Sequence, residues 1–74
     1  MLIKFEIYND GEFWCGRGIE VDIFTQGRTL DDLIGNIREA VELHYEESIG
    51  AGEQITIVTQ TEFQVGSVAK SSSC

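Results

Sequence analysis

The sequence has few cysteines and lacks any long apolar run. Its two cysteines are Cys15, inside a predicted strand, and Cys74, the last residue. Because a chain end is seldom ordered enough to hold disulfide geometry, we expect both to be free thiols, with Cys15 filling part of the core. There is neither a signal peptide nor an apolar run of about 18 residues, which a membrane span requires. These absences predict a reducing, cytoplasmic location without contact with a membrane.

Metal-binding and catalytic residues are also scarce. His44 is the one histidine, and the two cysteines lie far apart, so the ligand count and paired spacing of a zinc site are missing. His44 falls on the apolar stripe of a predicted helix, and we expect a packed ring rather than a general base. Glu6, Asp22 and Asp32 are the conceivable Mg²⁺ ligands, but nothing in the pattern brings them together. The sequence therefore predicts a protein that is not an enzyme and has no metal or cofactor.

Basic residues are few as well. Five lysines and arginines stand against 13 aspartates and glutamates, which gives a formal net charge of −8. Such a field repels phosphate backbones, so direct binding to nucleic acid is disfavoured. The same field speeds encounter with a basic protein partner, because electrostatic complementarity acts mainly on the association rate. An acidic surface that serves only solubility is the alternative interpretation.

The length of 74 residues suffices for one domain with a small core. Folded chains of this size hide about 60% of the surface that their unfolded chains expose, and pairing of subunits is a common way to hide more. We therefore expect a homo-oligomer. Leu43 is the candidate residue for self-association, because it lies among polar residues on the far side of the predicted helix from the apolar stripe.

The first part of the chain has the alternation that is typical of β-strands. Apolar and polar residues alternate over 2–8, and the Asn-Asp-Gly sequence that follows indicates a hairpin turn. The second strand is expected over 12–17. A two-residue loop would pair Ile7 with Trp14, and a three-residue loop would pair it with Phe13. Turn chemistry alone does not decide between the two registers.

A third strand is expected over 19–24, where the alternation resumes. Thr29 then has the position of a helix N-cap, followed by two aspartates that suit the first turn. The predicted helix has about five turns. Its apolar stripe consists of Leu30, Leu33, Ile34, Ile37, Val41, His44, Tyr45 and Ser48. A last strand is expected over 54–58, and a longer interpretation extends it to Phe63 and Val65.

The resulting order, βββαβ, predicts an α+β domain over 1–66 in which an antiparallel sheet carries one helix on one face. The polar residues 67–74 are expected to form a flexible C-terminal tail. No second helix remains to cover the other face of the sheet. That face is therefore left open for contact with another molecule.

The uncovered sheet face is the candidate partner-binding site. Tyr8 and Phe24 are expected there, with Trp14 if the hairpin register turns it that way, interleaved with Glu6 and Asp22. Aromatic residues are enriched in interfaces, which favours a contact surface. The alternative is that these are single apolar residues scattered on an ordinary surface.

The junction Thr25-Gln26-Gly27-x-Thr29-Leu30 leads into the predicted helix, and the other informative stretches are Asp10-Gly11, Phe13, Phe24 and Asn36-Ile37-Arg38-Glu39-Ala40-Val41-Glu42-Leu43. Together they resemble the HicB-like antitoxin family, without gaps from Ile3 to Glu47. Family members typically have Pro-Asp-x-Pro-Gly before the junction, whereas this chain has Gly18-Ile19-Glu20-Val21-Asp22. A more regular strand is therefore expected in place of the family's turn.

The resemblance implies a βββαβ fold that is related to a partial ribonuclease H fold without its catalytic carboxylates. It also implies an antitoxin that binds and masks a small basic, HicA-like toxin, which cleaves messenger RNA. Many members carry a C-terminal DNA-binding domain, and we expect this chain to end before such a domain and to act by occlusion alone. The alternative function is a stand-alone homo-oligomeric domain with no toxin partner.

Overall fold

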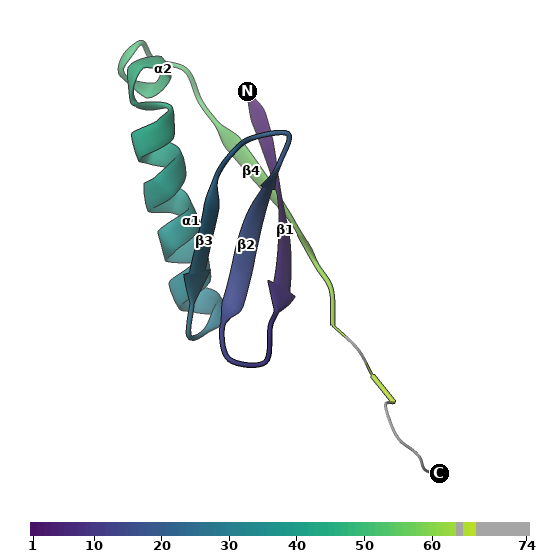
Figure 1. Ribbon diagram of the computed structural model, residues 1–74. Helices are drawn as coiled ribbons and strands as arrows, with labels where there is room; N and C mark the ends of the chain where they lie inside the picture. The colour runs from purple at the N-terminus through teal and green to yellow at the C-terminus, as the bar shows by residue number, and fades with distance from the viewer. Residues whose placement is uncertain (64, 67–74) are drawn as a thin grey trace.

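The computed structural model describes residues 1–63 and 65–66, and Figure 1 shows them as one sheet with a helix across it. The elements are β1 (Leu2–Asn9), β2 (Trp14–Ile19), β3 (Phe24–Gly27), α1 (Leu30–His44), α2 (Glu46–Gly50) and β4 (Thr56–Thr61). The strands lie in the order β3-β2-β1-β4. The predicted α+β fold of order βββαβ is confirmed. The structure differs from the prediction in two details. Strand β4 runs parallel to β1, so the sheet is mixed rather than antiparallel, and a short second helix follows the first.

The hairpin between β1 and β2 has a longer loop than either predicted alternative. Ile7 pairs with Gly16, not with Trp14 or Phe13, so both predicted registers are wrong. The carboxylate of Asp10 is the physical reason. Its Oδ1 accepts hydrogen bonds from the backbone N–H groups two and three residues later, at 2.9 and 2.8 Å, and holds the longer loop closed. This loop places Trp14 on the helix side of the sheet, half-buried against the core.

The connection between β2 and β3 is a tight turn, so the regular strand predicted over 19–24 is wrong. Glu20 has a left-handed backbone, with φ of 67°. The N–H group of Gly18 donates to the carbonyl of Ile23 at 2.8 Å. A Cβ atom at Gly18 would lie 2.5 Å from Cγ1 of Val21, so the turn needs glycine at that position.

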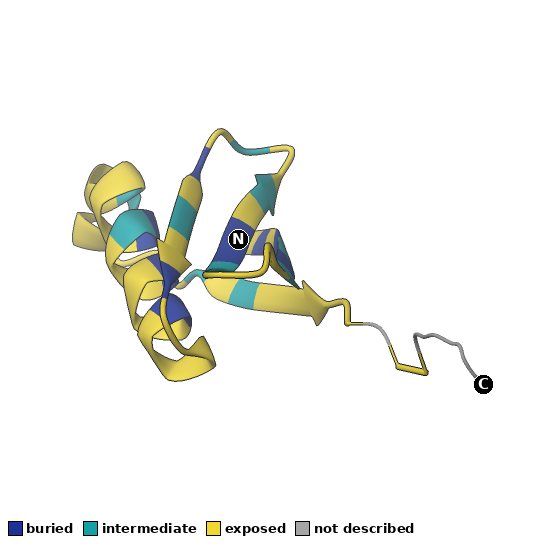
Figure 2. Ribbon diagram, turned by 60° about the horizontal axis from the view of Figure 1, so that its bottom comes forward, coloured by how far each residue is buried: buried dark blue, intermediate teal, exposed yellow. Residues whose placement is uncertain are grey.

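The core lies between α1 and the inner face of the sheet, and its buried members are Ile3, Phe5, Ile7, Ile23, Leu33, Ile37 and Val41. Two glycines of the sheet let the helix approach closely. A Cβ atom at Gly16 would lie 2.9 Å from Cδ1 of Ile37, and one at Gly27 would lie 2.7 Å from the backbone nitrogen of Leu33. The helix therefore packs over β2 and β3, while β4 stays exposed along most of its length (Figure 2).

The start of α1 is confirmed and its end is not. Thr29 is the N-cap, and its Oγ1 accepts a hydrogen bond from the N–H group of Asp32 at 3.0 Å. The buried residues of the stripe are Leu33, Ile37 and Val41. The helix ends at His44 because Tyr45, with φ −114° and ψ 33°, leaves the helical conformation, so the five-turn helix is shorter than predicted. His44 is exposed, and the prediction of a packed ring is wrong.

Several predictions concern the cysteines and the C-terminal part of the chain. Cys15 is a buried free thiol, as predicted. Strand β4 does not reach Phe63 or Val65. Cys74 and the predicted tail, 67–74, lie outside the described residues. In the described part of the chain, no helix has the length and the apolar character that crossing a membrane takes.

Candidate functional site

The sheet face opposite α1 is uncovered, as the predicted topology requires. Alternate residues of β1 point to this face, and their cross-strand partners point the same way. The larger apolar residues on it are Leu2, Tyr8, Ile19, Phe24 and Val58. Phe24 is 58% exposed and Leu2 is 55% exposed. The uncovered face therefore presents apolar side chains from all four strands.

Charged residues in the middle of this face neutralise one another. Glu6 and Arg17 are cross-strand partners and form an ion pair. The hydrogen bond and the charge of Glu6 raise the pKa of Arg17, so the guanidinium stays ionised. Lys4, two residues before Glu6 on β1, adds a second positive charge. The centre of the uncovered face is therefore not acidic.

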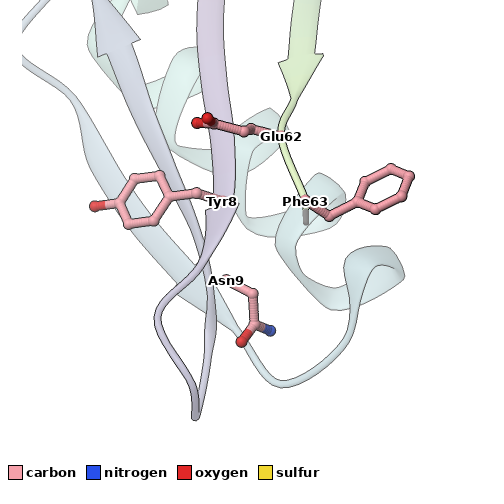
Figure 3. Close-up of a pocket in the computed structure, with 4 residues that line it drawn as sticks. All are labelled: Tyr8, Asn9, Glu62 and Phe63. Atoms are coloured by element: carbon pink, nitrogen blue, oxygen red, sulfur yellow. The ribbon is translucent and has the colours of Figure 1, made fainter. Parts of the chain in front are cut away.

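One end of the sheet, where β1 and the residues after β4 meet, has a shallow hollow of about 430 Å³, lined by Tyr8, Asn9, Glu62 and Phe63. Figure 3 shows that the side chains of Tyr8 and Glu62 extend to the same side of the sheet, whereas Phe63 points the other way. Asn9, Glu62 and Phe63 are exposed, and Tyr8 is half-buried. The hollow is therefore a surface recess suited to contact rather than an enclosed pocket.

Three of the predicted partner-binding residues share the uncovered face, namely Glu6, Tyr8 and Phe24. Trp14 does not, because the longer hairpin loop turns it toward the helix. Asp22 is exposed, but it lies in the turn between β2 and β3 rather than on a strand. The predicted surface of aromatic residues interleaved with carboxylates is thus only partly assembled.

A second exposed surface lies on the outer side of the helices. Leu43 is 74% exposed, which agrees with its predicted place opposite the apolar stripe, and Ile49 is 40% exposed. Together with Glu39, Glu42 and Glu46 they line a hollow of about 450 Å³. Glu42 and Leu43 follow Glu39 by three and four residues on α1, so the three share one side of that helix. Glu46 and Ile49 of α2 complete the lining. These five residues are called the acidic helix surface below.

Six of the 13 acidic residues of the chain lie on the two helices. The acidic residues of α1 and α2 are Asp31, Asp32, Glu39, Glu42, Glu46 and Glu47. Arg38 and His44 are the basic residues of the same two helices. A basic partner is therefore attracted to the outer side of the helices more strongly than to the middle of the sheet face.

Cys15 lies on the uncovered side of β2 but is buried there. Its Sγ is 3.7 Å from Oδ2 of Asp10 and 3.9 Å from the carbonyl oxygen of Phe13. Burial, together with the negative charge of Asp10, raises the pKa of the thiol. A protonated, covered thiol is a poor nucleophile, so Cys15 has a packing role.

The conceivable metal ligands lie in different parts of the fold. Glu6 is on β1, Asp22 is in the turn before β3, and Asp32 is in the first turn of α1. Throughout 1–63 and 65–66, no three histidine, cysteine, aspartate or glutamate side chains are close enough together to hold a metal ion.

His44 makes an edge-on contact with the ring of Tyr45, with 4.7 Å between ring centroids.

Sequence reasoning missed two residues of these surfaces. Arg17 neutralises Glu6, but this contact depends on the hairpin register, which the pattern left undecided. Ile49 joins Leu43 only because a second helix forms after the break between α1 and α2. The acidic pair that follows the break, in the first turn of α2, is a helix-start signal that would have indicated it.

Comparison of the chain with models of known protein families, with curated protein sequences and with solved structures finds no match. The likeness to HicB-like antitoxins therefore rests on the sequence motifs alone. The two exposed surfaces are interpreted from their own geometry.

Proposed function

We propose that this chain is a non-catalytic, antitoxin-like protein that binds and masks a small basic toxin, of the HicA-like kind, which cleaves messenger RNA. The observation that carries the proposal is the acidic helix surface, where two exposed apolar side chains lie among three carboxylates. This combination suits the basic side chains of a protein partner. The sequence motifs shared with HicB-like antitoxins support the same function.

The hollow of the acidic helix surface has the chemistry to hold an arginine or a lysine. The aliphatic stem of such a side chain packs on Leu43 and Ile49, and its charged end reaches the carboxylates around them. Arginine fits better than lysine, because its planar guanidinium pairs with a carboxylate through two parallel hydrogen bonds. The apolar residues then supply affinity, and the carboxylates supply specificity and a fast association.

Masking by this surface is steric and electrostatic. A toxin that cleaves RNA holds the phosphate backbone of its substrate with basic residues. Carboxylates that pair with those residues occupy them and repel the RNA. No catalytic group of the antitoxin is needed for this effect.

The uncovered sheet face is the weaker candidate for the same partner. Glu6 is already paired with Arg17, and Lys4 adds positive charge beside them. A basic partner therefore gains little electrostatic attraction there. The apolar residues of that face, Phe24 among them, remain available for a contact that does not depend on charge.

Titration calorimetry of the full chain with a small basic HicA-like ribonuclease tests the proposal. Leu43→Ser should weaken binding about tenfold or more, because it removes the most exposed apolar side chain of the surface. Glu42→Lys should lower the association rate, and the loss should be larger at low salt than at high salt. Phe24→Ala is the matched control on the uncovered face and should leave binding unchanged.

Two outcomes would contradict the proposal in different ways. If Phe24→Ala weakens binding while Leu43→Ser does not, the partner binds the uncovered face with Glu6, Tyr8 and Phe24, as the sequence predicted. If no basic ribonuclease binds the wild-type chain at all, the antitoxin function is wrong. The alternative function, a stand-alone homo-oligomeric domain, would then be favoured.

A further inference from the structure

Strand β4 forms one edge of the sheet, and half of its backbone groups point away from the sheet. The N–H group of Thr56 donates to the carbonyl of Met1, just before β1, at 2.8 Å, and that of Glu62 donates to the carbonyl of Ile7 in β1 at 3.0 Å. The N–H and C=O groups of successive residues point alternately to the two sides of a strand. Between Thr56 and Glu62, the backbone groups of the odd-numbered residues therefore point away from β1. These are Ile57, Thr59 and Thr61, and in the described part of the chain their outward N–H and C=O groups have no hydrogen-bond partner.

The opposite edge of the sheet is protected. Strand β3 has four residues, and α1 packs against it. The Nδ2 atom of Asn36 in α1 donates a hydrogen bond to the carbonyl of Gln26 at 2.8 Å, which occupies an outward group of that strand. Natural sheets commonly cover an edge in this way to prevent further strand pairing. Of the two edge strands that the structure describes, β4 is the longer and the less covered.

The composition of β4 favours pairing with a second copy of the same chain. Its sequence, Thr-Ile-Val-Thr-Gln-Thr, has no charged residue and no proline, which are the usual devices against edge pairing. A basic partner gains no electrostatic attraction from a neutral strand. Two copies of a chain with a net charge of −8 repel each other least where the paired residues are uncharged, as those of β4 are.

We propose that two copies of this chain pair antiparallel through β4, with the two-fold axis at Thr59. A two-fold axis between antiparallel strands is perpendicular to the sheet, so each residue opposes one whose side chain lies on the same face. Hydrogen-bonded pairs also require outward-pointing groups on both strands. With the axis at Thr59, Thr59 opposes its own copy and Ile57 opposes Thr61, and each pair exchanges two backbone hydrogen bonds.

The helix side of the sheet has an apolar hollow next to β4. A hollow of about 280 Å³ runs between α1 and β4, lined by Ile34, Ile37, Arg38, Ile57 and Thr59. Ile34 is 42% exposed there. The two-fold axis puts the hollows of the two copies on either side of the paired β4 strands. This self-association does not involve the acidic helix surface and does not depend on the proposed antitoxin function.

Sedimentation velocity of the full chain tests the pairing, and we expect the wild type to be a dimer. Thr59 is exposed and its backbone does not bond β1, so charged residues there leave the subunit folded. Thr59→Lys and Thr59→Glu each place two like charges at the axis, and each should weaken the dimer about tenfold or more. An equimolar mixture of the two variants should form a Lys–Glu dimer, which native mass spectrometry identifies by its mass.

Two controls separate this edge from other surfaces. Gln26→Lys adds the same charge at the protected edge and should leave the dimer intact. Leu43→Ser, which would break an association through the helices, should also leave it intact. A monomeric wild type, a Thr59→Lys variant that remains dimeric, or a mixture that fails to pair would each overturn the proposal. Loss of the dimer in Leu43→Ser would place self-association on α1 instead.

Discussion

The two edges of the sheet differ in how they end. At β3, a four-residue strand lies under α1, and the side chain of Asn36 bonds the carbonyl of Gln26. At β4, a strand of six residues lies away from the helix. The backbone groups that point outward from it have no hydrogen-bond partner in the described part of the chain. The difference arises because Gly16 and Gly27 have no side chain, which allows the helix to pack closely over β2 and β3. One helix can protect one edge of this sheet, and the other edge is left for association.

The largest loss of stability is expected from a change in the contact between α1 and the strands β2 and β3. Leu33 is fully buried and lies beside both Gly16 and Gly27. Leu33→Ala should lower the free energy of unfolding by about 2–5 kcal/mol, because it leaves a cavity under the helix. Urea denaturation followed by circular dichroism measures the loss. Ile34→Ala, at the next and exposed position, is the control and should cost clearly less. Equal losses would show that the helix does not depend on this contact.

A smaller loss is expected when the closest approach of helix and strand is obstructed. A Cβ atom at Gly27 would meet the backbone of α1, which cannot move aside as a side chain can. Gly27→Ala should lower the free energy of unfolding by about 1–3 kcal/mol. Gly35→Ala is the matched control, since nothing lies within 4 Å of its added Cβ and alanine favours a helix. It should raise stability, and destabilisation by both changes would contradict this packing.

A still smaller loss of stability is expected when the hydrogen bond that covers the β3 edge is removed. Asn36→Ala deletes the hydrogen bond to Gln26 and should lower stability by about 0.5–1.5 kcal/mol. Asn36→Asp keeps the shape but cannot donate, so it should cost a similar amount. If covering this edge prevents strand pairing, light scattering of either variant should show species larger than those of the wild type. A size that does not change from that of the wild type would mean that the packing of α1 alone protects the edge.

The smallest effect is expected away from both edges, in the loop that Asp10 closes. Backbone hydrogen bonds from Phe13 and then Glu12 lower the pKa of Asp10 below its usual 3.8. A lowered pKa in the folded state gives stability that is present above pH 4 and is lost as the pH falls through the folded value. Asp10→Asn should therefore slightly reduce the decrease in the unfolding temperature as the pH falls below 4. Thermal unfolding between pH 2 and pH 6 measures the slope, and an unchanged slope would contradict the assignment.

The parts of the fold that depend on neighbouring residues in the sequence were predictable. Thr29 caps α1 because a hydroxyl at that position reaches the amide of Asp32, a contact within one turn. The alternation over 2–8 and the helical spacing of the stripe gave β1 and the buried side of α1. The turn after β2 was not predictable, because it depends on a close contact between Gly18 and Val21 that alternation does not reveal.

The candidate site was predictable only where register did not matter. Leu43 is exposed because it lies opposite the stripe of a single helix, which spacing alone establishes. Trp14 faces the helix because the loop set by Asp10 pairs it with Asn9, which lies on the same face of β1 as Ile7. A three-residue loop would have turned Trp14 to the uncovered face, because side chains alternate between the two faces. The neutral centre of the uncovered face follows from the same register, which brings Arg17 to Glu6.

The covered thiol of Cys15 makes the β1–β2 hairpin observable in solution. With its Sγ held among loop atoms and its pKa raised, it should resist thiol reagents at neutral pH for as long as the hairpin stays closed. In a chain with Cys74 replaced by serine, the rate of labelling then reports how often this corner of the sheet opens. Labelling of Cys15 would therefore measure opening of the hairpin within a single copy of the chain.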